Sequence, residues 1–232
     1  MAIWARVGEF LAKLGTDAFS SVTEAVRTAF SGDAETRKQV AFSIAMIALS
    51  AKMAKADGIV TSHETEAFRD IFHIPEKEAN RVYRLYNFAK QDVAGYESYA
   101  RQVRTLFGDD DLVLKDVMDG LFHIAKADGV VHQRELEFLD RVAELLDISG
   151  KRYQRIRMRH LGSGDGDAWF QLAADPAWDN ETLKKHYREL VRENHPDRLV
   201  GRGVPAEFVA IATERLASIN HAWDIVRAER GI

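Results

Sequence analysis

The stretch Leu183-Lys-Lys-His-Tyr-Arg-Glu-Leu-Val-Arg-Glu-Asn-His-Pro-Asp-Arg198 decides the fold of the C-terminal part of this 232-residue chain. Its apolar residues are spaced as one face of an α-helix, and they are Leu183, Tyr187, Leu190 and Val191. Basic residues four apart form a stripe on another face: Lys184, Arg188 and Arg192. Asn180 is the expected N-cap. Pro196 ends the helix, because proline lacks the backbone N–H and disfavours the α conformation of the preceding residue.

A second helix is expected to return from near Pro205, a residue suited to a first helical position. Its apolar stripe is Phe208, Ala212, Leu216, Ile219, Trp223 and Val226. A loop of about ten residues joins the two helices, so they form an antiparallel hairpin. The tripeptide His195-Pro196-Asp197 is therefore predicted at the tip of this hairpin.

The hairpin resembles the J-domain of DnaJ-type co-chaperones. The residues that carry this resemblance are Trp169 and Leu172 (usually Tyr and Leu), Leu183, Tyr187-Arg188, Leu190, His195-Pro196-Asp197, Ile219-Asn220 and Ala222-Trp223. The resemblance implies docking on a DnaK-type ATPase, with Asp197 bonded to a partner arginine and Pro196 keeping the turn rigid. The expected partner-binding residues are His195, Pro196, Asp197, Tyr187, Lys184, Lys185, Arg188 and Arg192. Nothing near the tip stands out as a nucleophile, so we expect no catalytic residue and no enzyme.

Composition narrows the function classes. The formal charge of −4 gives no reason to expect general nucleic-acid binding. The chain contains no cysteine, which excludes disulfides and thiolate metal sites and fits a reducing compartment. No apolar run approaches the roughly 18 to 20 residues that a spanning helix needs. Strand-like alternation is scarce, so the expectation is an all-α cytoplasmic protein, with peripheral contact at the inner face of the membrane as the alternative.

An internal repeat organises the region before the hairpin. Ala54-Lys-Ala-Asp-Gly-Ile-Val60 returns as Ala125-Lys-Ala-Asp-Gly-Val-Val131, and each copy follows a long apolar helix, Phe42 to Met53 or Leu112 to Ile124. Two related helical hairpins around one core are expected. The region resembles the TerB-like helical domain, which also precedes a C-terminal J-domain in the DjlA family. Asn194-His-Pro-Asp-Arg-Leu-Val-Gly-Arg-Gly-Val-Pro205 adds to the DjlA resemblance. DjlA proteins commonly carry an N-terminal transmembrane segment, and this sequence shows none.

These patterns divide the chain into four parts. We expect an amphipathic helical segment over residues 1–34, a TerB-like domain over 35–160, a linker over 161–167 and a J-domain over 168–232. The linker is rich in glycine and polar residues, so it is expected to let the hairpin move relative to the body.

The repeated Asp-Gly sites have two interpretations. Four carboxylates could bind a divalent cation such as calcium or magnesium, and they belong to Asp57, Glu64, Asp128 and Glu135. A standard EF-hand is excluded, because Met53 and Lys55 would stand at ligand positions of its loop. The other interpretation is local: Thr61-x-x-Glu64 forms a capping box and Gly58 allows the turn.

Two further segments leave alternatives open. Ile3, Trp4 and Val7 lie on one helical face within residues 3–14. This face could dock on the protein's own core, on a second copy of the chain, or on a membrane with Trp4 at the level of the headgroups. The basic run Lys151–His160 is expected to be a solvated last helix of the body, with Arg152, Arg155 and Arg159 exposed. Its alternative is contact with anionic lipid or nucleic acid.

The function expected from these features is that of a co-chaperone. The hairpin recruits and stimulates a DnaK-type chaperone, and the TerB-like body supplies localisation, dimerisation or client choice. The alternative is a metal- or stress-sensing adaptor whose primary event is cation binding at the Asp-Gly carboxylates.

Overall fold

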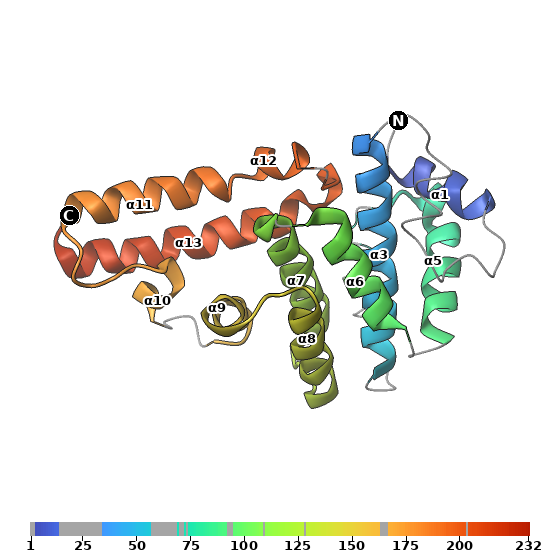
Figure 1. Ribbon diagram of the computed structural model, residues 1–232, viewed down its shortest axis with the longest axis horizontal. Helices are drawn as coiled ribbons and strands as arrows, with labels where there is room; N and C mark the ends of the chain where they lie inside the picture. The colour runs from blue at the N-terminus through green and yellow to red at the C-terminus, as the bar shows by residue number, and fades with distance from the viewer. Residues whose placement is uncertain are drawn as a thin grey trace.

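The computed structural model describes residues 3–13, 34–56, 69, 72, 74–91, 95–108, 110–127, 129–162, 167–202 and 204–232. Within these ranges the regular structure is helical and contains no strand, which confirms the all-α prediction (Figure 1). None of the described helices is both long and apolar enough to span a membrane.

The body of the protein is a bundle of helices around one long central helix. Its helices are α1 (Ile3–Lys13), α3 (Ala34–Ala56), α5 (Glu76–Gln91), α6 (Tyr96–Phe107), α7 (Asp111–Ala125), α8 (Gln133–Leu145) and α9 (Gly150–Leu161). Helix α3 contacts α1, α5, α6, α7 and α8. All residues from Val40 to Ala54 are buried, as expected for a helix surrounded on every side by other helices.

The sequence raised expectations about the two repeat copies and about the N-terminal helix, and the structure places both. Helices α3 and α7, which carry the apolar parts of the two repeat copies, pack against each other in one core. The N-terminal helix docks on this same core, where Trp4 is 1% exposed and its Nε1–H donates to the carbonyl of Phe72 at 2.8 Å. Trp4 is therefore a core residue of the body and not a side chain at a membrane surface.

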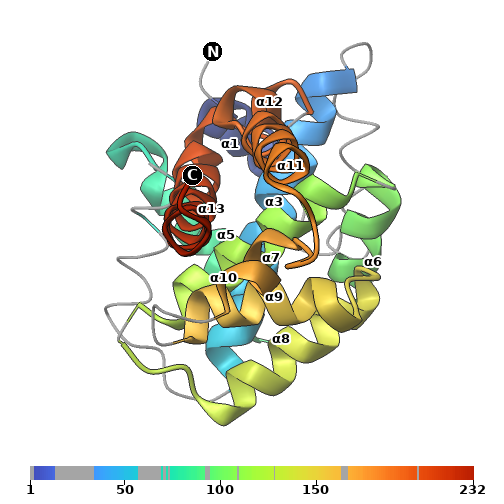
Figure 2. The same cartoon turned by 90° about the vertical axis from the view of Figure 1, so that its left-hand side faces the viewer.

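The C-terminal part forms the predicted antiparallel hairpin. Its elements are α10 (Ala168–Leu172), α11 (Asn180–Glu193), α12 (Pro196–Val200), the 3-10 turn η2 (Ala206–Phe208) and α13 (Val209–Arg230). Helices α11 and α13 run side by side, and α10 crosses α13 near its C-terminal half (Figures 1 and 2). The N-cap of α11 is Asp179, whose side chain accepts from the Thr182 N–H at 2.7 Å. The predicted cap, Asn180, was wrong by one position, because it is the first helical residue.

The hairpin has its own small core. Leu172 of α10, Leu183 of α11 and Trp223 of α13 are buried together, with Ala168, Ile219, Ala222 and Val226. The rings of Tyr187 and Trp223 stack with centroids 4.5 Å apart and planes 6° apart. This core holds the two long helices together independently of the body.

The end of the hairpin that carries α12 lies against the body. The other end, where α11 begins and α13 ends, projects away from the body (Figure 1). Helix α13 begins inside the body and continues through the hairpin: Phe208 and Ile211 belong to the body core, whereas Ile219 and Val226 belong to the hairpin core. Residues 163–166 of the predicted linker lie outside the described part of the chain. The movement expected at this linker stays a prediction, and the described contacts hold the hairpin on the body.

Candidate functional site: the hairpin tip and its attachment to the body

The predicted docking tripeptide is exposed at the start of α12. The side chain of His195 is 51% exposed and that of Asp197 is 91% exposed. Pro196 is the first residue of α12, where its missing N–H leaves no helical hydrogen bond unmade. The sequence therefore places a histidine and a carboxylate in solvent on a short, regular turn.

Local hydrogen bonds hold this turn in one shape. Asn194 is buried, and its Nδ2 and backbone N–H both donate to the carbonyl of Leu190, at 2.8 and 3.0 Å. The backbone N–H of Asp197 donates to Nδ1 of His195 at 3.3 Å, and that of Arg198 to the His195 carbonyl at 3.0 Å. The side chains of the tip are thus free to face a partner while the backbone is fixed.

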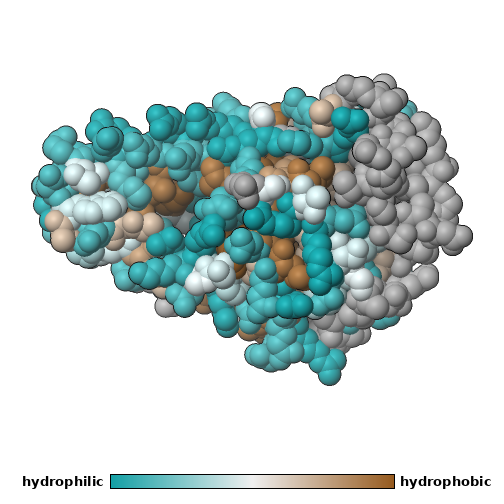
Figure 3. Space-filling view, viewed as in Figure 1, coloured by the Kyte–Doolittle hydropathy of each residue, from teal (hydrophilic) through white to brown (hydrophobic). Residues whose placement is uncertain are grey.

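A cationic face runs along α11 towards the tip. Lys185, Arg188 and Arg192 are exposed and have no carboxylate partner within the described part of the chain. Lys184 is half-buried and lies 3.9 Å from Glu181. Figure 3 shows that the surface over α11 is hydrophilic, with apolar side chains appearing along the line between α11 and α13. Three of the four predicted basic residues therefore present uncompensated charge to solvent.

Tyr187 differs from the other predicted docking residues. Its ring stacks on Trp223, and its hydroxyl donates to Oδ1 of Asn220 at 3.1 Å. Burial raises the pKa of this phenol, with Asp224 acting in the same direction. In the structure Tyr187 joins the two helices of the hairpin, and its role in partner binding stays a prediction.

The segment that follows the tip is anchored in the body. Arg202 Nε lies 3.6 Å from Oδ2 of Asp110, the N-cap of α7. Val204 and Phe208 are fully buried. The Phe208 ring makes edge contacts with the rings of Phe42 and Phe72, each with centroids 4.6 Å apart. The tip is therefore connected to α11 on one side and to the core of the body on the other.

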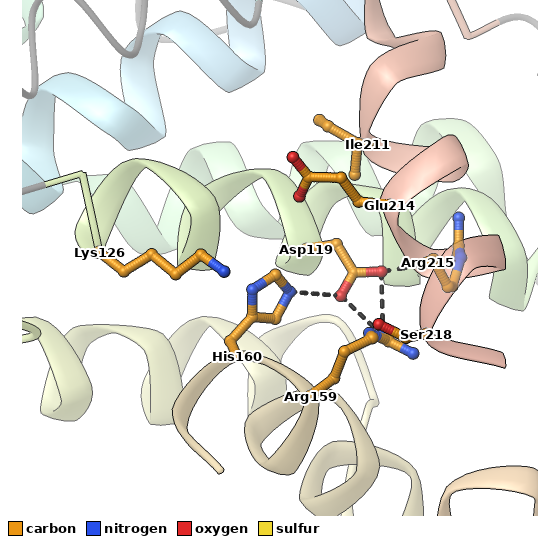
Figure 4. Close-up of a pocket in the computed structure, with 8 residues that line it drawn as sticks. All are labelled: Asp119, Lys126, Arg159, His160, Ile211, Glu214, Arg215 and Ser218. Atoms are coloured by element: carbon orange, nitrogen blue, oxygen red, sulfur yellow. Dashed lines mark hydrogen bonds and ion pairs between the residues drawn. The ribbon is translucent and has the colours of Figure 1, made fainter. Parts of the chain in front are cut away.

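A buried charge cluster joins α13 of the hairpin to α7 and α9 of the body, and Figure 4 draws Asp119, Arg159, His160 and Arg215. Asp119 of α7 receives two bonds from Arg159 Nη2, at 2.7 and 3.0 Å, and one from His160 Nε2 at 2.9 Å. Both partners come from α9. Arg215 of α13 pairs with Asp116 and lies 3.7 Å from Oδ2 of Asp119. We name Asp116, Asp119, Arg159, His160 and Arg215 the charged joint.

Burial and ion pairing together set the pKa values of the charged joint. Burial alone would raise the pKa of Asp119, but the charge of Arg159 and the bonds from His160 and Arg159 outweigh it and hold this pKa below its ordinary value. Burial lowers the pKa of His160 against the opposing effect of Asp119, so the ring is neutral at pH 7. Burial also lowers the pKa of Arg215, to about 10, which leaves the guanidinium charged. The cluster thus balances two carboxylates with two guanidinium groups.

The charged joint corrects the interpretation of the basic run. Arg159 was expected to be exposed, but its side chain is only 16% exposed and is bound to Asp119. Arg155 donates from Nε to the carbonyl of Phe170 at 2.8 Å, and Arg152 pairs with Asp111. Helix α9 therefore uses these arginines for internal contacts with α7 and α10. Arg152 is still 41% exposed, and contact of this run with anionic lipid or nucleic acid stays a prediction.

Of the four carboxylates proposed as cation ligands, only Glu135 is described. Its side chain is buried, and Oε2 accepts from the backbone N–H of His132 at 2.8 Å, which is a helix-capping contact. Asp57, Glu64 and Asp128 lie outside the described residues. No group of three or more potential metal ligands occurs in the part of the chain that the structure describes. Cation binding at the Asp-Gly sites stays a prediction.

Comparison with known proteins identifies the class to which this fold belongs. The family model described as "Tellurite resistance protein TerB" matches residues 43–158, which is half of the chain and covers α5, α6, α7, α8 and most of α3 and α9. The chain belongs to the TerB family. No solved structure matches it.

The relatives match a larger share of the chain than the family model does. The Co-chaperone protein DjlA of Aliivibrio fischeri is 26% identical over 234 residues, covering 87% of this chain and 83% of the relative. Those of Vibrio cholerae and Escherichia coli O157:H7 are 25% and 27% identical, over 87% and 84% of this chain and 82% and 81% of their own length. The chain is thus DjlA-like, and these relatives support a co-chaperone role in general terms. The family match and the relatives' names both favour a protein that is not an enzyme.

Proposed function

We propose that this protein is a co-chaperone that docks on a DnaK-type ATPase through the hairpin tip and stimulates its ATP hydrolysis. The observation that carries the proposal is the exposed His195-Pro196-Asp197 turn at the end of a helix with uncompensated positive charge. The resemblance of the hairpin to a J-domain supplies the identity of the partner. Relatives named as co-chaperones support the general role.

The charge of α11 brings the partner to the tip. Lys185, Arg188 and Arg192 share one face and attract an acidic surface over a range set by ionic strength. Glu189 and Glu193 on the same helix reduce the net charge, so attraction contributes more to the association rate than to the final affinity.

The tip then completes the recognition. Asp197 offers both carboxylate oxygens to solvent, and a bond to a partner arginine would be charge-assisted. His195 is held beside it, with Nδ1 3.6 Å from Oδ2 of Asp197. Docking that is stronger for the ATP-hydrolysing conformation of the partner raises its turnover, because a ligand shifts an equilibrium by its difference in affinity for the two states.

The experiment is the steady-state ATP turnover of a DnaK-type chaperone, with the wild-type protein and with His195→Gln added at equal concentration. We expect several-fold stimulation by the wild type and almost none by the variant. His221→Gln is the matched control, because His221 is an exposed histidine of α13 far along the chain from the tip. Equal stimulation by wild type and His195→Gln contradicts the proposal, as does the absence of stimulation by the wild type.

A further inference from the structure

Helix α13 is shared by two cores. Its buried residues follow one continuous stripe: Phe208 at the preceding turn, then Ile211, Ala212, Arg215, Ile219, Ala222, Trp223 and Val226. The first part of this stripe packs in the body, and the last part packs in the hairpin. Whatever fixes α13 on the body therefore also fixes the direction of the hairpin.

A charged side chain occupies the middle of this stripe. Arg215 stands where the spacing requires a core residue, and its side chain is 3% exposed. It meets Asp116 and Asp119, which are themselves 1% and 2% exposed in the centre of α7. An arginine at a core position is costly unless its carboxylate partners are in place, so α13 has few orientations in which this side chain faces both carboxylates.

The partners of Arg215 are themselves fixed from a third helix. Arg159 and His160 of α9 occupy the same carboxylate that Arg215 approaches, and the His160 ring stacks on Phe122 of α7 at 5.2 Å with planes 8° apart. A small cavity of about 40 Å³ lies at this meeting point, lined also by Lys126, Glu214 and Ser218. Glu214 of α13 lies 2.9 Å from His123 of α7 at its rim. Three helices thus meet through directional polar contacts.

Close packing on the other side restricts α13 further. Gly120 of α7 faces Ile211 of α13 and Met46 of α3, and a Cβ atom at Gly120 would lie 3.0 Å from each side chain. Apolar contacts of this kind hold the helices together but are non-directional. The hydrogen bonds to Asp119 and the contact between His123 and Glu214 are directional. The ion pairs of Arg215 weaken as the charges separate, so these contacts together select one rotation and one tilt among the arrangements that bury similar apolar area.

We propose that Arg215 is a positioning residue, which with the charged joint sets a single angle between the hairpin and the TerB body. The angle places the tip, because α12 and the segment to Phe208 are attached to the same end of α13. That consequence rests on the proposed function, whereas the angle itself does not. The charged joint selects this angle and does not supply the stability of the attachment, since buried ion pairs contribute little beyond well-packed apolar side chains.

The angle can be measured in the full chain, which contains no native cysteine to interfere with labelling. Nitroxide labels at Arg134→Cys on α8 and Ala228→Cys on α13, both exposed, report the distance between body and hairpin by pulsed electron paramagnetic resonance. Thr182→Cys with Ala228→Cys reports the hairpin alone. The test variant is Arg215→Met with Asp116→Leu, which replaces one charge pair by apolar side chains of similar size and leaves Asp119 with Arg159 and His160.

We expect a narrow distance distribution across the joint in the wild type and one roughly twofold wider in the test variant. In the test variant the distance distribution of the label pair within the hairpin stays unchanged, and the melting temperature falls by no more than a few degrees. An unchanged distribution in the test variant overturns the proposal. If that variant does not fold, two other measurements still test the proposal. A broad distance distribution in the wild type overturns the proposal. Arg215→Lys, which keeps the charge but loses the planar fork, must widen the distribution relative to the wild type.

Stimulation of the DnaK-type ATPase separates the two proposals. If the wild type stimulates, the test variant must do so several-fold less at sub-saturating concentration. Full stimulation alongside a widened distribution leaves the angle-setting role of Arg215 in place and overturns its consequence, that the angle places the tip for docking. If the wild type does not stimulate, the proposed function fails, and the distance measurement still decides whether the joint sets the angle.

Discussion

Two groups of cationic side chains in the hairpin meet opposite surroundings. On α11, Lys185, Arg188 and Arg192 are exposed and have no carboxylate partner among the described residues. On α13, Arg215 is buried and faces Asp116 and Asp119. The same kind of charge faces solvent on one helix and faces buried carboxylates on the other.

The contrast separates two uses of charge. An exposed face attracts a partner over several ångströms, is weakened by salt and contributes almost nothing to folding. A buried cluster is insensitive to salt and defines geometry, and removing one member leaves an uncompensated charge.

The largest effect is expected for Arg215→Ala. Removing the guanidinium leaves Asp116 buried without its partner and opens space between the two cores, which costs about 3–5 kcal/mol. For a chain of this size that lowers the melting temperature by roughly 10 °C. Thermal and urea unfolding followed by circular dichroism measure the change.

The matched control is Arg227→Ala on the same helix. Arg227 is 54% exposed and lies 3.4 Å from Asp224, so its loss costs at most about 0.5 kcal/mol. Equal effects at Arg215 and Arg227 would contradict the distinction between the two groups of charges.

A smaller effect is expected for Gly120→Val. The added side chain meets Ile211 and Met46, which are close enough that even a Cβ would need them to shift. Overpacking of this kind costs about 2 kcal/mol. Ala217→Val, at an exposed position of α13, adds the same kind of side chain without a clash and should change the free energy of unfolding by a few tenths of a kcal/mol. The comparison measures how tightly α13 is seated on α7.

The next effect depends on pH and concerns His160. Burial lowers its pKa below the ordinary value of 6.5, so the unfolded chain binds a proton at this site at a higher pH than the folded chain does. Its contribution to stability is complete above pH 6.5 and is lost as the pH falls towards the folded pKa, with a slope of at most about 1.4 kcal/mol per pH unit. His160→Gln keeps a donor for Asp119 but cannot titrate. Urea unfolding between pH 7.5 and 5.5, about one pH unit on each side of the ordinary value of 6.5, should show a shallower loss in the variant, and parallel curves would contradict this role.

The sequence predicts the tip better than the charged joint, because the tip is local. The spacing of Leu183, Tyr187 and Leu190 and the position of Pro196 are sufficient to predict α11, its end and the exposed turn. The charged joint depends on side chains from three helices. Arg159 and Asp119 are 40 residues apart in the chain, and no local pattern pairs them.

One part of the charged joint was missed for a geometrical reason. Counting steps of four from Phe208 through Ala212 assigns Leu216 to the buried stripe. Each step of four overshoots a turn of 3.6 residues by about 40°, so a step of three must follow, and it reaches Arg215. In the structure Arg215 is buried and Leu216 is only partly so. The available signal was Asp116 and Asp119, two acidic residues about one helical turn apart among the apolar residues of α7.

The smallest effect on unfolding is expected for the exposed face of α11. Replacing Lys185, Arg188 and Arg192 together by alanine should change the free energy of unfolding by no more than about 0.5 kcal/mol, because alanine favours helix and no ion pair is lost. The concentration needed for half-maximal stimulation of a DnaK-type ATPase should rise roughly tenfold at low salt and less as the salt is raised. Replacing Lys38, Arg134 and Lys151, which are exposed basic residues of the body, removes the same charge elsewhere. If that control weakens stimulation as much, net charge and not the α11 face attracts the partner. If neither triple replacement weakens stimulation, the exposed charges of α11 have no part in docking. The buried and exposed arginines would then differ in their surroundings but not in their function.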